Sequence, residues 1–237
     1  MKTNISTPHD SLATRLAGLQ QCLKGGGRPL VSAKNASQPL PSPARIIAVS
    51  KTHPPERIEE ALRLGVTDFG ENKVQEAQGK FPSLKANHPE LRLHLIGPLQ
   101  SNKAKEAVAL FDVIHTIDRP KIADAVCAEL KKQNRVVSCL VQINIGEEPQ
   151  KAGVLPQDLA ALLEHCHTIG LPIHGLMCIP PEGENPAPYF ALMYQLKRTH
   201  QLAELSMGMS GDYETALRFG ATMIRVGTAL FGARNHS

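Results

Sequence analysis

The chain has 237 residues, of which 42% are hydrophobic and only 4% are aromatic, and its formal net charge is +4. An α/β barrel of about 250 residues can form one unit of this size, and the shortage of aromatic residues predicts an aliphatic core. The basic residues are spread along the chain without an aromatic-rich cluster, so we expect an anionic ligand and no nucleic-acid partner.

The cysteine pattern and the hydropathy restrict the cellular setting. The five cysteines make an odd count and form no CxxC pair, which argues against a disulfide framework and a structural zinc site. No apolar run approaches the roughly 20 residues that a membrane span requires. We therefore expect a cytoplasmic protein that has no membrane partner.

The N-terminal region predicts one helix and one loop. Apolar residues recur at helical spacing at Leu12, Leu16, Leu19 and Leu23, which predicts an amphipathic helix over residues 11–23. Residues 24–44 are rich in Gly, Ser, Asn and Pro. This composition predicts a flexible loop, to which we assign no chemistry.

Strand and helix patterns alternate from residue 46 onward. The predicted strands are residues 46–51, 66–70, 91–96, 113–116, 136–144, 173–179, 204–207 and 222–226. The predicted helices are residues 55–64, 72–80, 101–110, 118–133, 156–169, 188–202 and 211–219. Helices between strands imply a parallel sheet, and eight such strands close a barrel. We thus expect a single α/β domain over residues 1–237, a (β/α)8 TIM barrel in which the N-terminal helix replaces the missing last helix.

Lys51 ends the first predicted strand. Alternation along the strand puts Ile47, Val49 and Lys51 on one side. Desolvation at the lip of a buried strand would favour the uncharged amine, the form that attacks carbonyl groups. The alternative is an ordinary strand-end lysine that extends to solvent.

The turns after the last two predicted strands resemble an anion-binding site. Ser210 and Gly211 stand at the predicted start of a helix, and Gly227 and Thr228 follow the eighth strand. In this fold the loops after strands seven and eight often bind phosphate through backbone N–H groups. The alternative is that Ser210 only caps a helix and Gly227 only serves a turn.

Arg225 is predicted to point into the mouth of the barrel. It has the same parity as Met223 on the eighth strand. A guanidinium there could face a phosphate or a heteroaromatic nitrogen. The alternative is a buried ion pair with Asp212 or Glu214.

Other common catalytic patterns are missing from the sequence. His94, His115 and His174 fall on predicted strands without a neighbouring metal-ligand pattern, and His165 and His167 point to different sides of a predicted helix. We therefore expect no metal. No paired carboxylates dominate the strand ends, and no GxSxG, Walker or GxGxxG motif is present.

Taken together, several segments resemble the pyridoxal 5′-phosphate (PLP) homeostasis protein family, whose fold is similar to the N-terminal barrel of alanine racemase. The matching segments are residues 48–51, 70–76, 94–103, 175–177, 206–210 and 225–232. The resemblance implies that Lys51 forms a Schiff base, an internal aldimine, with PLP. It also implies that Arg225 faces the pyridine nitrogen and that Asn72 lies beside the cofactor. The phosphate would be held by Ser210, Gly227 and Thr228.

The function that this resemblance implies is PLP homeostasis. The protein would hold PLP and pass it to apo forms of PLP-dependent enzymes, as a monomer and without catalytic turnover. One alternative is a PLP-dependent amino-acid racemase or a related enzyme; a racemase needs a second base, and Tyr189, Tyr194 and Tyr213 fall on or beside predicted helices. Another alternative, from the lysine and the anion site alone, is a Schiff-base aldolase acting on a phosphorylated sugar.

Overall fold

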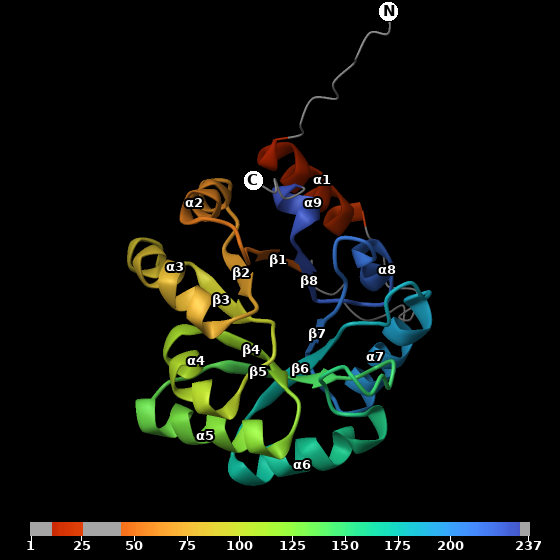
Figure 1. Ribbon diagram of the computed structural model, residues 1–237. Coiled ribbons are helices and arrows are strands. Elements are labelled where there is room, and N and C mark those ends of the chain that lie inside the picture. The colour runs from red at the N-terminus through yellow and green to blue at the C-terminus, as the bar shows by residue number, and fades with distance from the viewer. Residues whose placement is uncertain (1–10, 26–43, 233–237) are drawn as a thin grey trace, which may run out of the picture.

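Eight parallel strands close into a barrel in the computed structural model, which describes residues 11–25 and 44–232 (Figure 1). The strands follow one another around the barrel in chain order, and β8 pairs with β1 to close it. Their bounds are β1 Arg45–Val49, β2 Asp68–Glu71, β3 Arg92–Leu95, β4 Val113–Ile117, β5 Ser138–Ile143, β6 Ile173–Cys178, β7 Glu204–Ser206 and β8 Met223–Val226. The predicted TIM barrel is confirmed.

Helices surround the barrel on its outside (Figure 1). Their bounds are α1 Leu12–Gly25, α2 Pro55–Arg63, α3 Val74–Asn87, α4 Ala104–Leu110, α5 Pro120–Gln133, α6 Leu159–Ile169, α7 Ala187–Thr199, α8 Tyr213–Arg218 and α9 Thr228–Phe231. Short 3-10 turns at Ser101–Lys103 and Pro156–Asp158 precede α4 and α6. Each strand therefore leads into a helical segment, which places the ends of the strands beside the loops that could bind a ligand.

The core has two layers because successive strand residues point to opposite sides of the sheet. The large outer layer lies between strands and helices and includes Phe69 and Phe81, which are fully buried. Inside the barrel the apolar contact is a small cluster of Ile47, Val113, Leu140 and Met223, contributed by four strands. Several other interior positions carry buried polar side chains, among them His94, His115 and Arg225.

The N-terminal helix has the predicted role. Leu12, Leu16 and Leu19 are buried, and α1 packs against the four-residue α9. The two helices lie side by side in Figure 1. Since α9 is too short to cover the space outside β8, α1 completes the ring of helices.

Several predicted boundaries differ from the structure, among them three helix ends. Lys24 and Gly25 belong to α1, not to the predicted loop 24–44, and residues 26–43 lie outside the described part of the chain. Helix α3 continues through Pro82 to Asn87, whereas the predicted helix ended at residue 80. Burial of apolar residues on both sides of that proline outweighs the lost hydrogen bond. Helix α8 starts at residue 213 rather than 211.

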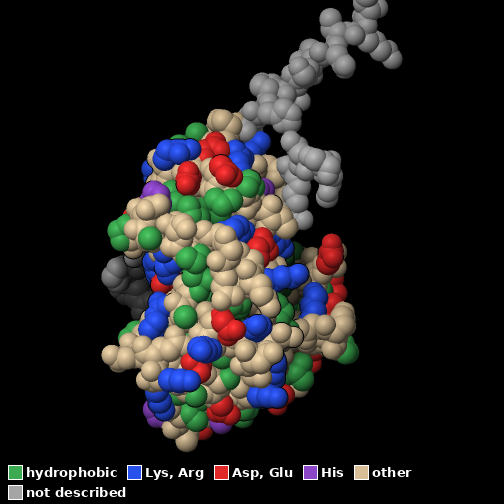
Figure 2. All heavy atoms as spheres, turned by 60° about the vertical axis from the view of Figure 1, so that its left-hand side comes forward, with side chains coloured by type: hydrophobic (Ala, Val, Ile, Leu, Met, Phe, Trp, Pro, Cys, Tyr) green, Lys and Arg blue, Asp and Glu red, His purple; other side chains and the backbone are tan. Residues whose placement is uncertain are grey.

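Acidic and basic side chains are interspersed over the face shown in Figure 2. Within residues 11–25 and 44–232, no helix is long and apolar enough to cross a membrane. All the cysteines are unpaired thiols. Burial raises the pKa of Cys139 and of Cys178 to about 12, so these thiols are unreactive at neutral pH.

Candidate functional site

Lys51 lies in the turn that follows β1, at the C-terminal end of the barrel. Its side chain is half-buried, and no residue of the described ranges forms a hydrogen bond or ion pair with its amine. Thr52, the next residue, has a left-handed backbone with φ of 64°. This conformation is strained for a β-branched residue. The turn therefore holds an unpaired amine at the barrel mouth; Lys51 was predicted as the last residue of the strand, but β1 ends two residues earlier, at Val49.

Lys80 of α3 stabilises this turn from outside the barrel through ion pairs and a hydrogen bond. Its amine contacts the carboxylate of Glu71 at 2.7 Å and that of Glu76 at 2.9 Å. It also donates to the carbonyl oxygen of Ser50 at 3.1 Å. The Glu76 carboxylate accepts a hydrogen bond from the Thr52 N–H at 2.5 Å. The strained backbone after Lys51 is thus held by charged groups of α3.

Glu71 and Asn72 follow at the end of β2. Glu71 is fully buried, and burial raises the pKa of its carboxyl group despite hydrogen bonds from Lys80 and Ser50. Asn72 is half-buried immediately after it. The backbone of Gly97 passes so close to Asn72 that a Cβ at residue 97 would lie 2.2 Å from the Asn72 carbonyl oxygen. Glycine is required there because the loop after β3 presses on Asn72.

The turn that contains Ser210 contacts the residues that follow β8. The hydroxyl of Ser210 accepts a hydrogen bond from the backbone N–H of Ala229 at 3.2 Å. Among the described residues, no acceptor pairs with the backbone N–H groups of Ser210, Gly211, Gly227 or Thr228. Unpaired N–H groups in two adjoining turns favour an anion.

One detail of the prediction for Ser210 is wrong. Ser210 does not start or cap α8; that position belongs to Asp212, whose carboxylate accepts from the N–H of Met209 at 2.6 Å. Ser210 lies in the turn before the helix. Its N–H is available because this turn uses only the later N–H groups, those of Asp212 and Tyr213, in backbone bonds to the Met209 carbonyl.

Arg225 is buried inside the barrel, as its parity predicted. One guanidinium nitrogen donates to the hydroxyl of Ser206 at 2.7 Å, and the other donates to the carbonyl oxygen of Cys178 at 2.8 Å. Burial lowers the pKa of Arg225. In the described ranges Arg225 has no ion pair, so the alternative of a pair with Asp212 or Glu214 is excluded there.

The amine, the N–H groups and the guanidinium belong to neighbouring elements. Strand β1 pairs with β8 so that Ala48 lies opposite Val226, and Ile47 lies opposite Arg225. A Cβ at Gly227 would lie 3.6 Å from Val49. The segment that ends at Lys51 is therefore adjacent to the turn with the unpaired N–H groups. This arrangement can bind a carbonyl compound that carries an anionic group.

Sequence reasoning assigned no role to four polar residues behind Arg225. Asp68, His94, His115 and Ser206 are buried on the inside of the barrel and bond to one another in series. The available signal was a polar residue inside an apolar strand, as in the segments around His94 and His115. Within the described ranges no group of His, Cys, Asp and Glu could hold a metal ion.

Comparison with known proteins identifies similar sequences and structures. The family model for the N-terminal domain of alanine racemase matches residues 32–235. The chain is 42% identical over 205 residues to the pyridoxal phosphate homeostasis protein of Aquifex aeolicus, covering 81% of this chain and 88% of that one. It is 38% identical over 238 residues to the Pseudomonas aeruginosa protein of the same name, covering 98% of both.

Solved structures extend the similarity. PipY of Synechococcus elongatus PCC7942 is 38% identical, and 94% of this chain covers 100% of it. The TM-score is 0.81 against PipY without PLP and 0.78 against PipY with PLP bound. An alanine racemase of Clostridium difficile has a TM-score of 0.71 at 14% identity, with 97% of this chain covering 58% of the racemase. At that identity the likeness establishes the shared barrel fold alone.

Proposed function

Because this chain belongs to the pyridoxal phosphate homeostasis protein family, we propose that it binds PLP through Lys51 and stores the cofactor for transfer rather than for turnover. The observation that carries the proposal is the unpaired, half-buried amine of Lys51 beside the unpaired N–H groups that follow β8. An amine next to an anion site matches a ligand that is both an aldehyde and a phosphate ester.

The residues of the site fit each chemical group of PLP. The amine of Lys51 suits the aldehyde, and the half-buried side chain of Asn72 suits a place beside the ring. The phosphate matches the backbone N–H groups and hydroxyls of Ser210, Gly227 and Thr228, where backbone donors and the start of α9 favour negative charge. When bound, PLP supplies an electrophilic carbonyl and an electron-withdrawing ring.

Arg225 favours storage over catalysis. A guanidinium can only donate hydrogen bonds, so a ring nitrogen that faces it remains unprotonated. An unprotonated ring withdraws electrons more weakly than a ring whose nitrogen carries a proton that a neighbouring carboxylate stabilises. An arginine at position 225 therefore favours binding of the cofactor without strong activation of its ring.

The tyrosines also argue against racemisation, which requires a second base. The hydroxyl of Tyr213 contacts the Cys22 thiol of α1 at 3.9 Å, and its pKa is raised to about 12. The hydroxyl of Tyr189 donates to Glu184 outside the barrel. Both hydroxyls are thus engaged by groups other than Lys51. We extend the proposal to a monomer that gives PLP to apo forms of PLP-dependent enzymes.

The first prediction concerns Lys51. The Lys51→Ala protein should lose the visible absorbance band of covalently bound PLP, because no other amine is presented in the same turn. Lys105→Ala is the matched control, since Lys105 is exposed on α4 and its loss should leave the band intact. Borohydride reduction followed by peptide mapping should put the pyridoxyl label on Lys51. A label on another lysine would disprove this assignment.

A separate assay tests the absence of turnover. Optical rotation is followed for a panel of L- and D-amino acids with the PLP-loaded protein, and no sustained change is expected. Steady loss of rotation that disappears in Lys51→Ala would establish a racemase instead. A purified protein that takes up no PLP would leave only the aldolase alternative for the lysine and the anion site.

A further inference from the structure

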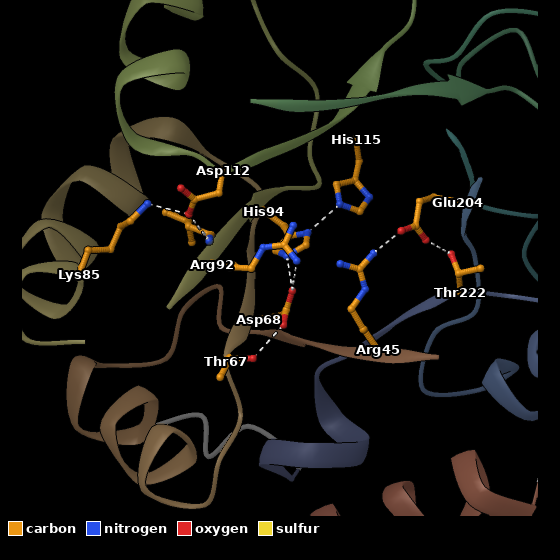
Figure 3. A network of polar contacts seen from close by, with 11 residues as sticks. Arg45, Thr67, Asp68, Lys85, Arg92, His94, Asp112, His115, Glu204 and Thr222 are labelled. Atoms are coloured by element: carbon orange, nitrogen blue, oxygen red, sulfur yellow. Dashed lines mark hydrogen bonds and ion pairs between the residues drawn. The ribbon is translucent and has the colours of Figure 1, made fainter. Parts of the chain in front are cut away.

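Hydrogen bonds in series connect Arg225 to Asp68 through the interior of the barrel. Arg225 donates to Ser206 at 2.7 Å, and Ser206 lies 2.9 Å from Nδ1 of His115. Nε2 of His115 lies 2.9 Å from Nδ1 of His94, whose Nε2 lies 2.9 Å from Asp68. Figure 3 shows the part of this series in which His94 lies between Asp68 and His115. We call these five residues the Asp68–Arg225 chain.

The Asp68–Arg225 chain runs through the interior of the barrel from one end toward the other. Asp68 is the first residue of β2, at the end of the barrel opposite Lys51, whereas Ser206 and Arg225 come at the third position of β7 and β8. All five residues are buried; the most exposed is Asp68 at 7%. A series of polar groups in a dry interior is costly unless every member is paired, so its bonds restrict one another.

The donors of the Asp68–Arg225 chain all point the same way. The Asp68 carboxylate can only accept, so Nε2–H of His94 donates to it, and a neutral His94 must then accept at Nδ1 from Nε2–H of His115. A neutral His115 accepts at Nδ1 from the Ser206 hydroxyl, whose oxygen accepts from the guanidinium of Arg225. Both imidazoles are neutral in this arrangement.

The charges around the two imidazoles agree with that assignment. Burial lowers the pKa of His94. Burial, the repulsion that His94 would exert if it were protonated, and the charges of Arg225, Arg45 and Arg92 keep the pKa of His115 well below its ordinary value. Burial alone would raise the pKa of Asp68, but hydrogen bonds from His94 and Thr67 and the nearby charge of Arg92 keep it below the ordinary value. The chain thus has a cation at one end, a carboxylate at the other and no charge between them.

Among the described residues Arg225 has no ion pair, and its charge is supported in two ways: directly by the nearby negative charge of Asp212, and through the hydrogen bonds of the series by Asp68. In residues 11–25 and 44–232 no carboxylate lies within ion-pair distance of its guanidinium, and an isolated buried cation is strongly unfavourable. A negative charge on Asp68 polarises each hydrogen bond of the series in turn. The Ser206 oxygen therefore becomes a better acceptor for Arg225.

We propose that Asp68, His94, His115 and Ser206 are positioning residues that fix the orientation and charge of the Arg225 guanidinium, so that it presents a donor to the ring nitrogen of a heteroaromatic aldehyde. The inference rests on the proposed function, because it takes PLP as the aldehyde. The Ser206 hydroxyl and the Cys178 carbonyl engage two guanidinium nitrogens. The orientation of the remaining donors is set by these two bonds.

The first test uses the protein without any cofactor. Histidine labelled with 15N should show His94 and His115 as neutral Nε2–H tautomers at neutral pH by NMR. Ser206→Ala should release His115 from this tautomer, since the donor to its Nδ1 is gone. A protonated His115, or one with its hydrogen on Nδ1 in the unmodified protein, would overturn the donor order and with it the proposal.

The second test measures recognition of the ring nitrogen. Affinities are compared for PLP and for its carbocyclic analogue, in which a CH group replaces the ring nitrogen. The unmodified protein should prefer PLP, and Ser206→Ala and Asp68→Asn should each reduce this preference about three- to tenfold, the worth of one modest hydrogen bond. Asp68→Asn keeps the size and an acceptor oxygen, so it tests the charge without cutting the chain.

Glu204→Gln is the matched control. Glu204 lies on β7 two residues before Ser206 and bonds Arg45 and Thr222, outside the Asp68–Arg225 chain (Figure 3). This variant should keep the preference for PLP. If Ser206→Ala and Asp68→Asn also keep the preference for PLP, the proposal fails while PLP storage stands. If the unmodified protein binds neither compound but shows the predicted tautomers, the proposed function fails and the chain only stabilises the barrel.

Discussion

Ser210 illustrates how one side chain can serve both a turn and a ligand. Its hydroxyl accepts from the Ala229 N–H and so ties the turn before α8 to the first turn of α9. The hydroxyl hydrogen remains available for an anion, because an accepted bond uses only an oxygen lone pair. The same residue thereby joins the two turns and adds a donor to their unpaired N–H groups.

This geometry predicts a phosphate-specific effect at the residue scale. Ser210→Ala should weaken binding of PLP by roughly 10- to 100-fold, the usual value of a hydrogen bond to a charged group. Binding of pyridoxal, which has no phosphate, should change little. Both affinities can be measured by titration at the absorbance band of the bound compound.

Ser83→Ala provides the control, because Ser83 is exposed on α3. It should bind both compounds like the unmodified protein. Equal weakening of PLP and pyridoxal in Ser210→Ala would mean that the serine shapes the site without contacting the phosphate.

At the scale of elements, α3 acts as the outer support of the turn that presents Lys51. Lys80 reaches from α3 to Glu71 on β2 and to the Ser50 carbonyl, and its side chain is only 11% exposed. Glu71 has no exposure at all. One oxygen of its carboxylate has no hydrogen-bond partner in the described part of the chain. The carboxylate therefore depends on Lys80 for its charge balance.

Removal of one partner should be much more harmful than removal of both. Lys80→Met would leave the Glu71 carboxylate buried beside an apolar side chain, at a cost of about 3–5 kcal/mol in the free energy of unfolding. The double variant Lys80→Met/Glu71→Gln should recover most of this loss. Urea unfolding of the two variants measures the difference. Equal losses in both would show that packing, not charge, makes Lys80 important.

For the whole molecule, the interior of the barrel is divided between apolar and polar layers. The cluster around Ile47 and Met223 packs in the usual aliphatic manner. Two polar networks accompany it, the Asp68–Arg225 chain and the contact of Arg45 with Glu204. Buried neutral histidines make the stability of such a barrel depend on pH.

The sign of this dependence follows from the lowered pKa values of His94 and His115. The unfolded chain binds protons at these histidines near pH 6.5, whereas the folded chain resists them until a lower pH. Their contribution to stability is therefore complete above about pH 6.5 and is lost as the pH falls toward the folded values. Between pH 7 and pH 5.5 the free energy of unfolding should fall by about 1–3 kcal/mol.

Urea unfolding at several pH values measures this effect. His115→Gln has one titrating group fewer and should lose roughly half of the pH dependence. A free energy of unfolding that stays flat from pH 7 to pH 5.5 would mean that the histidines are not held neutral by the fold.

The sequence was sufficient for the barrel and, to within about two residues, for the ends of its strands. Strands buried on both faces appear as short apolar runs, and glycine or proline marks most of their ends. Lys51, Gly227 and Thr228 became candidates because they stand at the ends of such runs, and parity placed Arg225 inside the barrel. Helix boundaries were less certain, as Pro82 and the start of α8 show, because burial of neighbouring residues competes with local signals.

Only the tertiary structure decided what surrounds these residues. His115 and Ser206 are 91 positions apart, and closure of the barrel alone brings them into contact. A histidine in an apolar strand has the same sequence context whether it fills space or links two charges. The sequence thus determined that Lys51 and Arg225 share one barrel. The fold decided that Lys51 has no partner among the described residues, whereas Arg225 is tied through Ser206 and two histidines to Asp68, because hydrogen bonds depend on distances in space.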